Sequence, residues 1–405
     1  MTNTSKEFSL LPESELLVWC ARTAMTDDLK ERIQQRVQEP LDWIRLLKLA
    51  AHHGVVPLLY RNLSTLCSDC VPAESLARLR QRTYAGALLN GLLADELVVL
   101  CEAFAAHGVP VIPIKGATLA IAAYGDLALR DFRDIDLIVR ESAIAQAQAC
   151  LLAQGYERIA APAKPDQEDG PYYLFVKKRT LFQVDLQSVM AHQHFQFQLD
   201  RPEFWHRRTN VLLANKTVSG LAPEDLLILL CVHGSKHAWG ELKWVCDVAE
   251  LLGRQSRLDW DLILASASEW RCRRLLLMGL SLANHLLAAP VPKTVLAKLS
   301  ADKDIQMLSN RMPSTLLADR HTGVEEARAV GLYFSLKDSW LDRWRFGLML
   351  CRDRSPIVMT PPAWFPWHTS LSRLGRLVLP VHQMLRSLLP SAIRGFINRW
   401  VQNYG

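Results

Sequence analysis

The sequence lacks the features that mark secreted and membrane-spanning proteins. No long apolar run is present, since the most hydrophobic segment, residues 275–291, is interrupted by Asn284 and His285 and is short for a bilayer span. The N-terminus is largely polar, so we expect no signal peptide. Nine cysteines are scattered along the 405 residues, and the one close pair, Cys67 and Cys70, has no second pair to complete a zinc site. We therefore expect a cytoplasmic protein.

Acidic residues are missing from the C-terminal end of the chain. After Asp353 the sequence carries six arginines among leucines and aromatic residues, but no aspartate or glutamate. We predict basic amphipathic helices within residues 354–405, with residues 370–405 making a peripheral contact with a membrane or a protein. The alternative is a pair of helices that pack on the body with their arginines outward. The overall charge of +6 does not support general nucleic-acid binding.

Length and hydrophobic periodicity predict the organisation of the chain. Half of the residues are hydrophobic, which is enough to bury the cores of two or three domains. We predict an α+β fold, with a small mixed sheet flanked by helical regions on both sides, and boundaries at 1–107, 108–215, 216–353 and 354–405. The N-terminal helices are expected over residues 13–24, 27–38, 41–53, 56–66, 73–81 and 85–107.

Two carboxylates two residues apart are the most informative feature of the sequence. Asp134 and Asp136 lie in a strand-like apolar segment, and side chains two apart on a strand point to the same face. Two adjacent carboxylates repel each other unless a cation lies between them, and such hard oxygen ligands suit Mg²⁺. The alternative is a pair of solvated residues at the end of a strand.

A glycine turn precedes this pair. The apolar run of residues 109–114 is followed by Lys115 and Gly116, and then by a helix-like segment, which predicts a strand, a tight turn and a helix. Gly116 would let backbone N–H groups approach a phosphate, and Lys115 and the Thr118 hydroxyl could add donors. An ordinary connection between strand and helix is the alternative.

A third carboxylate follows on a predicted hairpin. Residues 172–177 and 181–186 are expected to form two strands joined by a basic turn. Asp185 lies on the polar side of the second strand and could face Asp134 and Asp136.

Taken together, these segments resemble the bacterial family of uncharacterised nucleotidyltransferases. The resemblance is carried by residues 115–139, by Val184-Asp185-Leu186 and by residues 221–247. Segments within residues 42–60 also resemble the family's N-terminal helical part, so that the resemblance covers roughly residues 10–290. It implies a polymerase-β-like core in which Asp134, Asp136 and Asp185 bind two Mg²⁺ ions and act on an NTP, for which ATP is expected. It does not imply an acceptor.

Several basic residues are candidates for the nucleotide-binding part of this site. Arg130 and Arg133 precede the carboxylate pair, and their guanidinium groups suit a triphosphate, although solvated loop positions would also explain them. On a predicted helix over 223–239, His233 and His237 share the apolar face and Lys236 lies at its edge. Core histidines and a zinc site are the alternatives, and the resemblance favours the catalytic cleft. The same ambiguity applies to Lys243, Trp244 and Asp247.

The sequence departs from the superfamily pattern at two positions. The turn usually carries Gly-Ser or Gly-Gly, but here Ala117 follows Gly116, which weakens the grip on a phosphate. The family often has a histidine after the third carboxylate, where this chain has Gln187, so a titratable group is lost. The general base is expected to be the carboxylate itself, and therefore catalysis need not fail.

The function predicted from the sequence is Mg²⁺-dependent transfer of an NMP group from an NTP to a hydroxyl or phosphate of a small molecule or a protein. Three alternatives stay open: a toxin-type modifier of RNA ends or proteins, a catalytically silent nucleotide-binding module, and a membrane-associated accessory protein. Ala117 and Gln187 favour the silent module, and the basic C-terminal residues favour the accessory protein.

Overall fold

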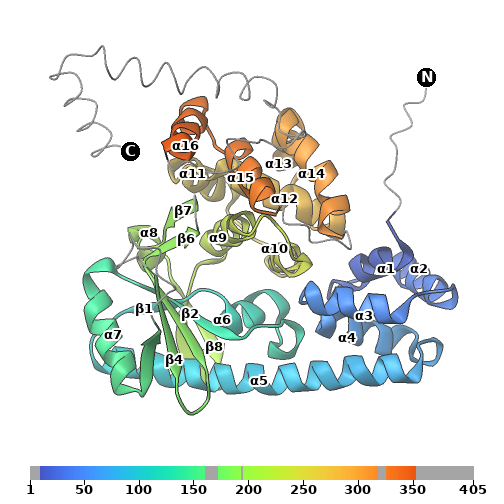
Figure 1. The fold of residues 1–405 in the computed structure, drawn as a ribbon, viewed down its shortest axis with the longest axis horizontal. Coiled ribbons are helices and arrows are strands. Elements are labelled where there is room, and N and C mark those ends of the chain that lie inside the picture. Colours follow the sequence, from blue (N-terminus) through green and yellow to red (C-terminus); the bar gives the residue numbers. More distant parts are fainter. Residues whose placement is uncertain (1–9, 160–171, 193–194, 318–324, 353–405) are drawn as a thin grey trace. The chain divides into compact units, whose positions relative to one another are not determined.

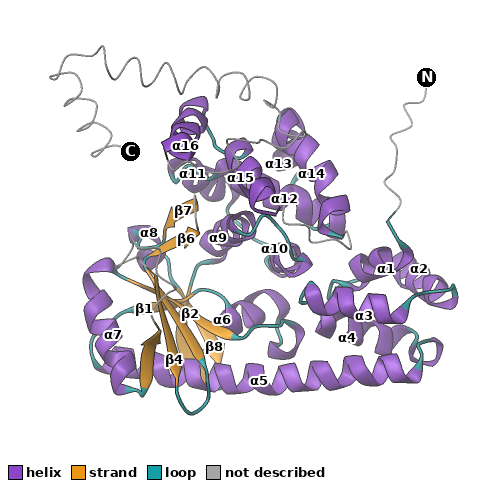
Figure 2. Ribbon diagram, in the orientation of Figure 1, coloured by secondary structure: helices purple, strands orange, loops and turns teal. Residues whose placement is uncertain are grey.

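The computed structural model of the chain describes residues 10–159, 172–192, 195–317 and 325–352 (Figure 1). The chain divides into two compact units, Met1–Asp319 and Arg320–Gly405, so that the predicted region 216–353 spans the division. The basic helices predicted within 354–405, including the contact predicted for 370–405, lie outside the described residues. Helices predominate around a small set of strands (Figure 2), and the predicted α+β class is confirmed.

The N-terminal residues form helices, in agreement with the hydrophobic pattern. Asp42 begins one of them by accepting a hydrogen bond from the backbone N–H of Arg45 at 2.9 Å. The predicted break between residues 81 and 85 is wrong, because this stretch has no proline and the chain continues as one 34-residue helix. The helices are α1 (Pro12–Cys20), α2 (Asp27–Gln38), α3 (Trp43–His52), α4 (Val56–Leu66) and α5 (Ala73–Ala106).

A mixed five-stranded sheet follows, with the strand order β1-β2-β5-β4-β3. The central strand β5 is parallel to its neighbour β2, and all other neighbouring strands are antiparallel. The second strand of the predicted hairpin begins two residues later than expected, because Leu181 has a φ of 60° and belongs to the turn. The strands are β1 (Val111–Pro113), β2 (Asp134–Val139), β3 (Tyr156–Ile159), β4 (Tyr172–Lys177) and β5 (Gln183–Gln187).

The core of this part lies between the sheet and helix α5. Ile135, Leu137 and Val139 of β2 are buried together with Leu97 and Phe104 of α5. Since side chains alternate along a strand, packing these three residues against α5 leaves Asp134 and Asp136 on the opposite face. Helix α7 (Ile144–Ala153) contributes Ala147, Cys150 and Leu151 to the same core.

Two hairpins and a group of helices complete the first unit. Helix α9 ends at Lys236 rather than at residue 239 as predicted, because Ala238 and Trp239 have positive φ values of 49° and 55°. This reversal lays the Trp239 ring against Gly234, where an added Cβ would come within 2.5 Å of it. The elements are α6 (Gly116–Leu119), β6 (Val189–His192), β7 (Phe195–Gln198), α8 (Pro202–His206), β8 (Thr209–Leu213), β9 (Lys216–Gly220), α9 (Pro223–Lys236), α10 (Leu242–Arg254), α11 (Trp260–Glu269), α12 (Arg273–Leu287), α13 (Lys293–Ala301) and α14 (Lys303–Leu316).

The second unit contains α15 (Glu325–Ser335) and α16 (Trp340–Arg352) among its described residues. Within the described part of the whole chain, no helix combines the length and the apolar character needed to cross a membrane.

Candidate active site

The parallel pairing of β2 with β5 brings three carboxylates together. Asp136 lies directly beside Asp185 in the register of the two strands, and Asp134 lies two residues before Asp136 on the same face. One ligand atom from each of the three residues lies within 4.8 Å of the others. The sequence predicted this convergence of Asp134, Asp136 and Asp185, and the structure places the three residues accordingly.

The electrostatics of the three carboxylates fit a divalent cation. The charge of Asp136 raises the pKa of Asp134 above its ordinary value, and burial adds to this, while Lys115, Arg130 and Lys243 act in the opposite direction. The surrounding cations therefore compensate only part of the repulsion. A donor set made of three carboxylates suits a hard ion such as Mg²⁺, whereas zinc prefers thiolate and imidazole ligands.

Two side chains hold the carboxylate of Asp136. The Lys115 ammonium lies 2.9 Å from Oδ2, and the Gln187 side-chain amide donates a hydrogen bond of 3.1 Å to Oδ1. Gln187 lies two residues after Asp185 on β5, hence on the same face. From the sequence, we interpreted Gln187 only as the loss of a titratable histidine. In the structure its side chain contacts Asp136 and helps to position that carboxylate. The two-residue spacing from Asp185 was the signal that could have revealed this contact.

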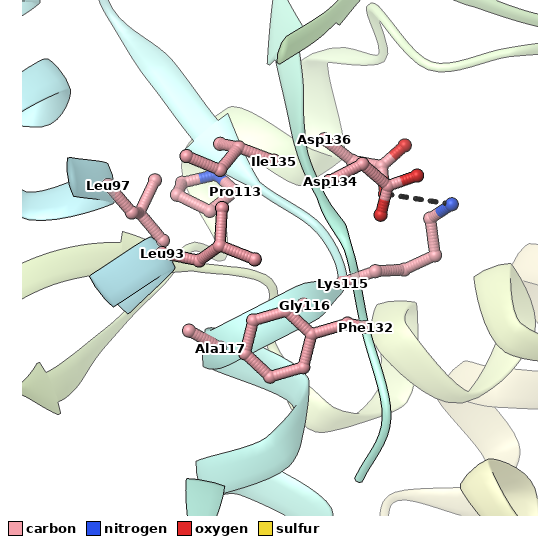
Figure 3. Close-up of a pocket in the computed structure, with 10 residues that line it drawn as sticks. All are labelled: Leu93, Leu97, Pro113, Lys115, Gly116, Ala117, Phe132, Asp134, Ile135 and Asp136. Atoms are coloured by element: carbon pink, nitrogen blue, oxygen red, sulfur yellow. Dashed lines mark ion pairs between the residues drawn. The ribbon is translucent and has the colours of Figure 1, made fainter. Parts of the chain in front are cut away.

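The turn between β1 and α6 lies directly beside the carboxylates. In Figure 3 the Lys115 ammonium and the carboxylates of Asp134 and Asp136 lie on one side of β2, while Ile135 and the α5 residue Leu97 lie on the other. Gly116 has a φ of 55°, and a Cβ at this position would come within 3.3 Å of the backbone oxygen of Asp134. Glycine is therefore required both by its backbone conformation and by the close approach of β2.

Replacing Gly116 with alanine is expected to destabilise the protein by about 1–2 kcal/mol, the cost of placing a Cβ in the left-handed region. The matched control is Gly253→Ala in helix α10, where an added Cβ meets nothing within 4 Å and φ is not positive. This control should be neutral or stabilising by up to about 1 kcal/mol, because alanine favours the helix. Urea unfolding of both variants measures the difference, and equal effects would contradict the conformational argument.

Thr118 and Arg133, both predicted to contact the phosphates, lie in different surroundings. The Thr118 hydroxyl donates its hydrogen to the backbone oxygen of Lys115 at 3.0 Å, and thus closes the turn instead of offering a donor to a phosphate. Arg133 is exposed immediately before β2. Ala117 is buried and lines the small recess beside the turn.

Arg130 is committed to a buried ion pair. Its Nε and Nη2 donate to the two carboxylate oxygens of Asp247 at 2.8 and 2.9 Å, and the Tyr124 hydroxyl donates to the same carboxylate at 2.8 Å. Burial lowers the pKa of Arg130, but the charge and hydrogen bonds of Asp247 more than compensate, so it stays charged. The Nε–Nη2 edge of the Arg130 guanidinium is therefore committed to Asp247 and is not offered to a triphosphate. Arg130 joins the loop before β2 to helix α10.

The side chains at the end of α9 lie close to the carboxylates. Burial and the charge of Lys115 lower the pKa of Lys236 to about 8, whereas Asp136 and Asp185 act to raise it. Burial is also the main reason why the pKa of His233 lies well below its ordinary value, followed by the neighbouring charge of Lys115. Lys236 therefore lies within electrostatic reach of two of the three carboxylates, and His233 is neutral at pH 7.

The two histidines form an aromatic cluster with a tryptophan of α10. The ring of His237 stacks on Trp244, with centroids 4.8 Å apart, and His233 meets His237 edge-on at 4.7 Å. The Lys243 ammonium lies 5.7 Å from the centre of the Trp244 ring and 2.6 Å from a carboxylate oxygen of Glu241. His233 Nδ1 is buried without a hydrogen-bond partner among the described residues. This cluster combines aromatic packing with one buried polar atom that has no partner among the described residues.

Comparison with known proteins agrees with this geometry. Residues 39–288 match the family model described as uncharacterised nucleotidyltransferase. This range includes the carboxylates, the Gly116 turn and helices α9 and α10. No curated protein matches the chain.

Proposed function

The chain belongs to the family of uncharacterised nucleotidyltransferases, and we propose that it transfers an NMP group from an NTP to a hydroxyl or phosphate of a small-molecule or protein acceptor. The observation that carries the proposal is the convergence of Asp134, Asp136 and Asp185 within 4.8 Å beside the Gly116 turn. ATP is the expected NTP. A cytoplasmic location and a peripheral contact through residues 370–405 belong to the same proposal.

The carboxylates would hold the metal ions in this reaction. Asp134 and Asp136 would bind both Mg²⁺ ions, and Asp185 would bind the second. When bound, the ions stabilise the negative charge that develops on the phosphoryl oxygens and lower the pKa of the acceptor hydroxyl. Gln187 and Lys115 orient the Asp136 carboxylate through its two oxygens, so that the binding face is set before substrate arrives.

The remaining residues bind and orient the substrates. Asp185 accepts the proton of the acceptor hydroxyl as the new bond to the α-phosphorus forms and pyrophosphate leaves. Lys236 and Lys115 place positive charge beside the carboxylates, where the triphosphate would bind. Exposed Arg133 is placed to contact the outer phosphates, and His237 to contact the nucleotide. We assign Arg130 a positioning role, because its ion pair with Asp247 holds the chain that leads into β2.

The test is incubation of the protein with each α-labelled NTP, Mg²⁺ and a cell extract, followed by identification of the labelled product. Transfer of label that is abolished by a chelator supports the proposal. A catalytically silent module would transfer no label with any NTP. Gln187, one of the two residues that favoured that alternative, donates a hydrogen bond to Asp136.

Asp185→Asn is expected to separate nucleotide binding from transfer. If Asp185 serves mainly as the proton acceptor, the variant should keep most of its affinity for the Mg²⁺-bound NTP and lose transfer by about 10²–10⁴-fold. Calorimetric titration measures the affinity, and label transfer measures the rate. Loss of affinity equal to that of Asp134→Asn would instead make Asp185 a plain metal ligand.

A further inference from the structure

Helix α5 carries an exposed apolar stripe on the face that points away from the sheet. Tyr84, Leu88, Leu92 and Val99 are 63%, 69%, 49% and 46% exposed. At about 100° per residue these four side chains fall within an arc of about 80°. Large apolar side chains gathered on one helix face are unusual on a monomer and mark a surface that another molecule covers. We call these four residues the α5 stripe.

The stripe lies on the outer surface of the first unit. Leu93 and Leu97, on the opposite face of α5, line the recess beside Gly116. In Figure 1 the helix runs along one border of the unit, with the N-terminal helices on its inner side, while the strands cross it in this view. Gly91, at the edge of the stripe, has open space where a Cβ would lie. A second helix could therefore approach α5 closely at the middle of the stripe.

The charges along α5 are segregated by sign, with basic residues before the stripe and acidic residues at its C-terminal end. Arginines occupy positions 78, 80 and 82, and no acidic residue occurs between residues 75 and 94. Acidic residues occupy positions 95, 96 and 102, and no lysine or arginine occurs between residues 83 and 106. The helix thus has a basic segment, an apolar centre and an acidic segment, in this order.

When two copies of α5 pair antiparallel, this order of charges makes the two helices complementary to each other. With the two-fold axis between Leu88 and Leu92, Leu88 of one copy faces Leu92 of the other, and Arg80 lies on the same flank as Glu102 of the other copy. Residues 78–82 of each copy then lie opposite residues 98–102 of the other. The present partner of Glu102, Lys216, forms an exposed ion pair with it, which contributes little and can be exchanged.

We propose that the α5 stripe is a dimer interface and that its occupant is the same face of a second copy of this chain, packed antiparallel. An anionic membrane fits this face less well, because Asp95 lies within the same arc as the stripe and the acidic segment would be repelled. A different protein could cover the leucines, but the alternation of charge along α5 favours a copy of itself. The proposal does not depend on the reaction at the carboxylates.

Sedimentation equilibrium of the full chain tests the interface. The wild type is expected to be a dimer, and Leu88→Glu is expected to weaken dimerisation on the order of 100-fold, since it places charge at the centre of the interface. Leu152→Glu, on helix α7 with 55% exposure, is the matched control and should stay dimeric. The unfolding midpoint of each variant shows that an exposed substitution has left the fold intact.

A charge-inversion pair tests the antiparallel arrangement. One variant carries Glu at positions 78, 80 and 82, and the other carries Asp95→Lys and Glu102→Lys. Glu96 is left in place because its carboxylate holds Tyr156 and Lys177. Each variant alone should be monomeric, because like charges then face each other, and mixing the two should give a heterodimer.

Several results would overturn the proposal. A monomeric wild type would do so, and its sedimentation with anionic vesicles through the same leucines would identify the face as a membrane surface. A dimer that Leu88→Glu leaves intact would place the interface elsewhere. Failure of the two charge-inverted variants to associate would exclude the antiparallel pairing. NTP binding by the monomeric Leu88→Glu variant is expected to be unchanged, because Leu88 faces away from the Gly116 turn.

Discussion

Asp134→Asn and Asp136→Asn are each expected to reduce Mg²⁺-dependent NTP turnover by about 10³-fold or more, because the metal ions supply much of the charge stabilisation in the transition state. Each substitution keeps the size of the side chain and removes its charge. It also relieves the repulsion that raises the pKa of Asp134. Asp134→Asn should therefore show equal or higher stability in urea, whereas Asp136→Asn also removes the counter-ion of the partly buried Lys115 ammonium and should be less stable than Asp134→Asn.

The matched control for these two variants is Asp261→Asn, an exposed aspartate in the first turn of α11. It should keep full turnover and nearly full stability. Label transfer from the NTP found for the wild type gives the rates, and calorimetry gives the affinity for Mn²⁺ as a probe of the metal site. Activity that persists in both folded variants would show that the three carboxylates are not the catalytic centre.

Asp247→Ala is expected to destabilise the protein by about 3–5 kcal/mol, because it leaves the Arg130 guanidinium buried without a counter-ion. Arg130 and Asp247 are 6% and 1% exposed, so water cannot replace the lost partner. Tyr124→Phe removes one hydrogen bond to the same carboxylate and should cost only about 0.5–1.5 kcal/mol.

An exposed ion pair is the appropriate comparison for this buried one. Lys178 pairs with Glu157 at the surface, where the two side chains are 71% and 56% exposed. Lys178→Ala should change stability by no more than about 1 kcal/mol. Denaturant titration of the three variants ranks them, and a loss for Asp247→Ala as small as that for Lys178→Ala would show that the buried pair is not needed for the fold. The Asp247→Ala variant should also lose nucleotide affinity if Arg130 positions the loop that enters β2.

The contrast between Asp136 and Arg130 shows which contacts sequence spacing could predict. The placement of Asp134 and Asp136 on one face follows from the two-residue period of a strand, and Gly116 follows from the turn between strand and helix. The ion pair of Arg130 with Asp247 joins residues 117 positions apart. No local period carries that information, and the assignment of Arg130 to the triphosphate followed from its proximity to Asp134 in the sequence alone.

Helix boundaries likewise include some that follow from local sequence and others that depend on tertiary contacts. The N-terminal helices and most of α9 follow from the hydrophobic period and from N-terminal signals such as Pro223 and Asp42. The end of α9 at Lys236 depends on the Trp239 ring, which folds back against Gly234. The continuity of α5 through Thr83 depends on that residue being buried in the folded chain. Tertiary packing therefore determines where α9 ends and whether α5 is continuous, because the local helix propensities at these positions are weak.

The sequence by itself determined the three carboxylates, the glycine turn, the α+β class and the family, because each depends on residue type at short spacing. Only the tertiary structure decided that β2 and β5 are parallel neighbours, which places Asp185 beside Asp136 and Gln187 within hydrogen-bond distance of it. It also decided which face of α5 packs on the sheet, and so leaves the α5 stripe exposed. The physical reason is that strand pairing and helix docking are set by long-range burial of apolar surface, which acts between segments far apart in the chain.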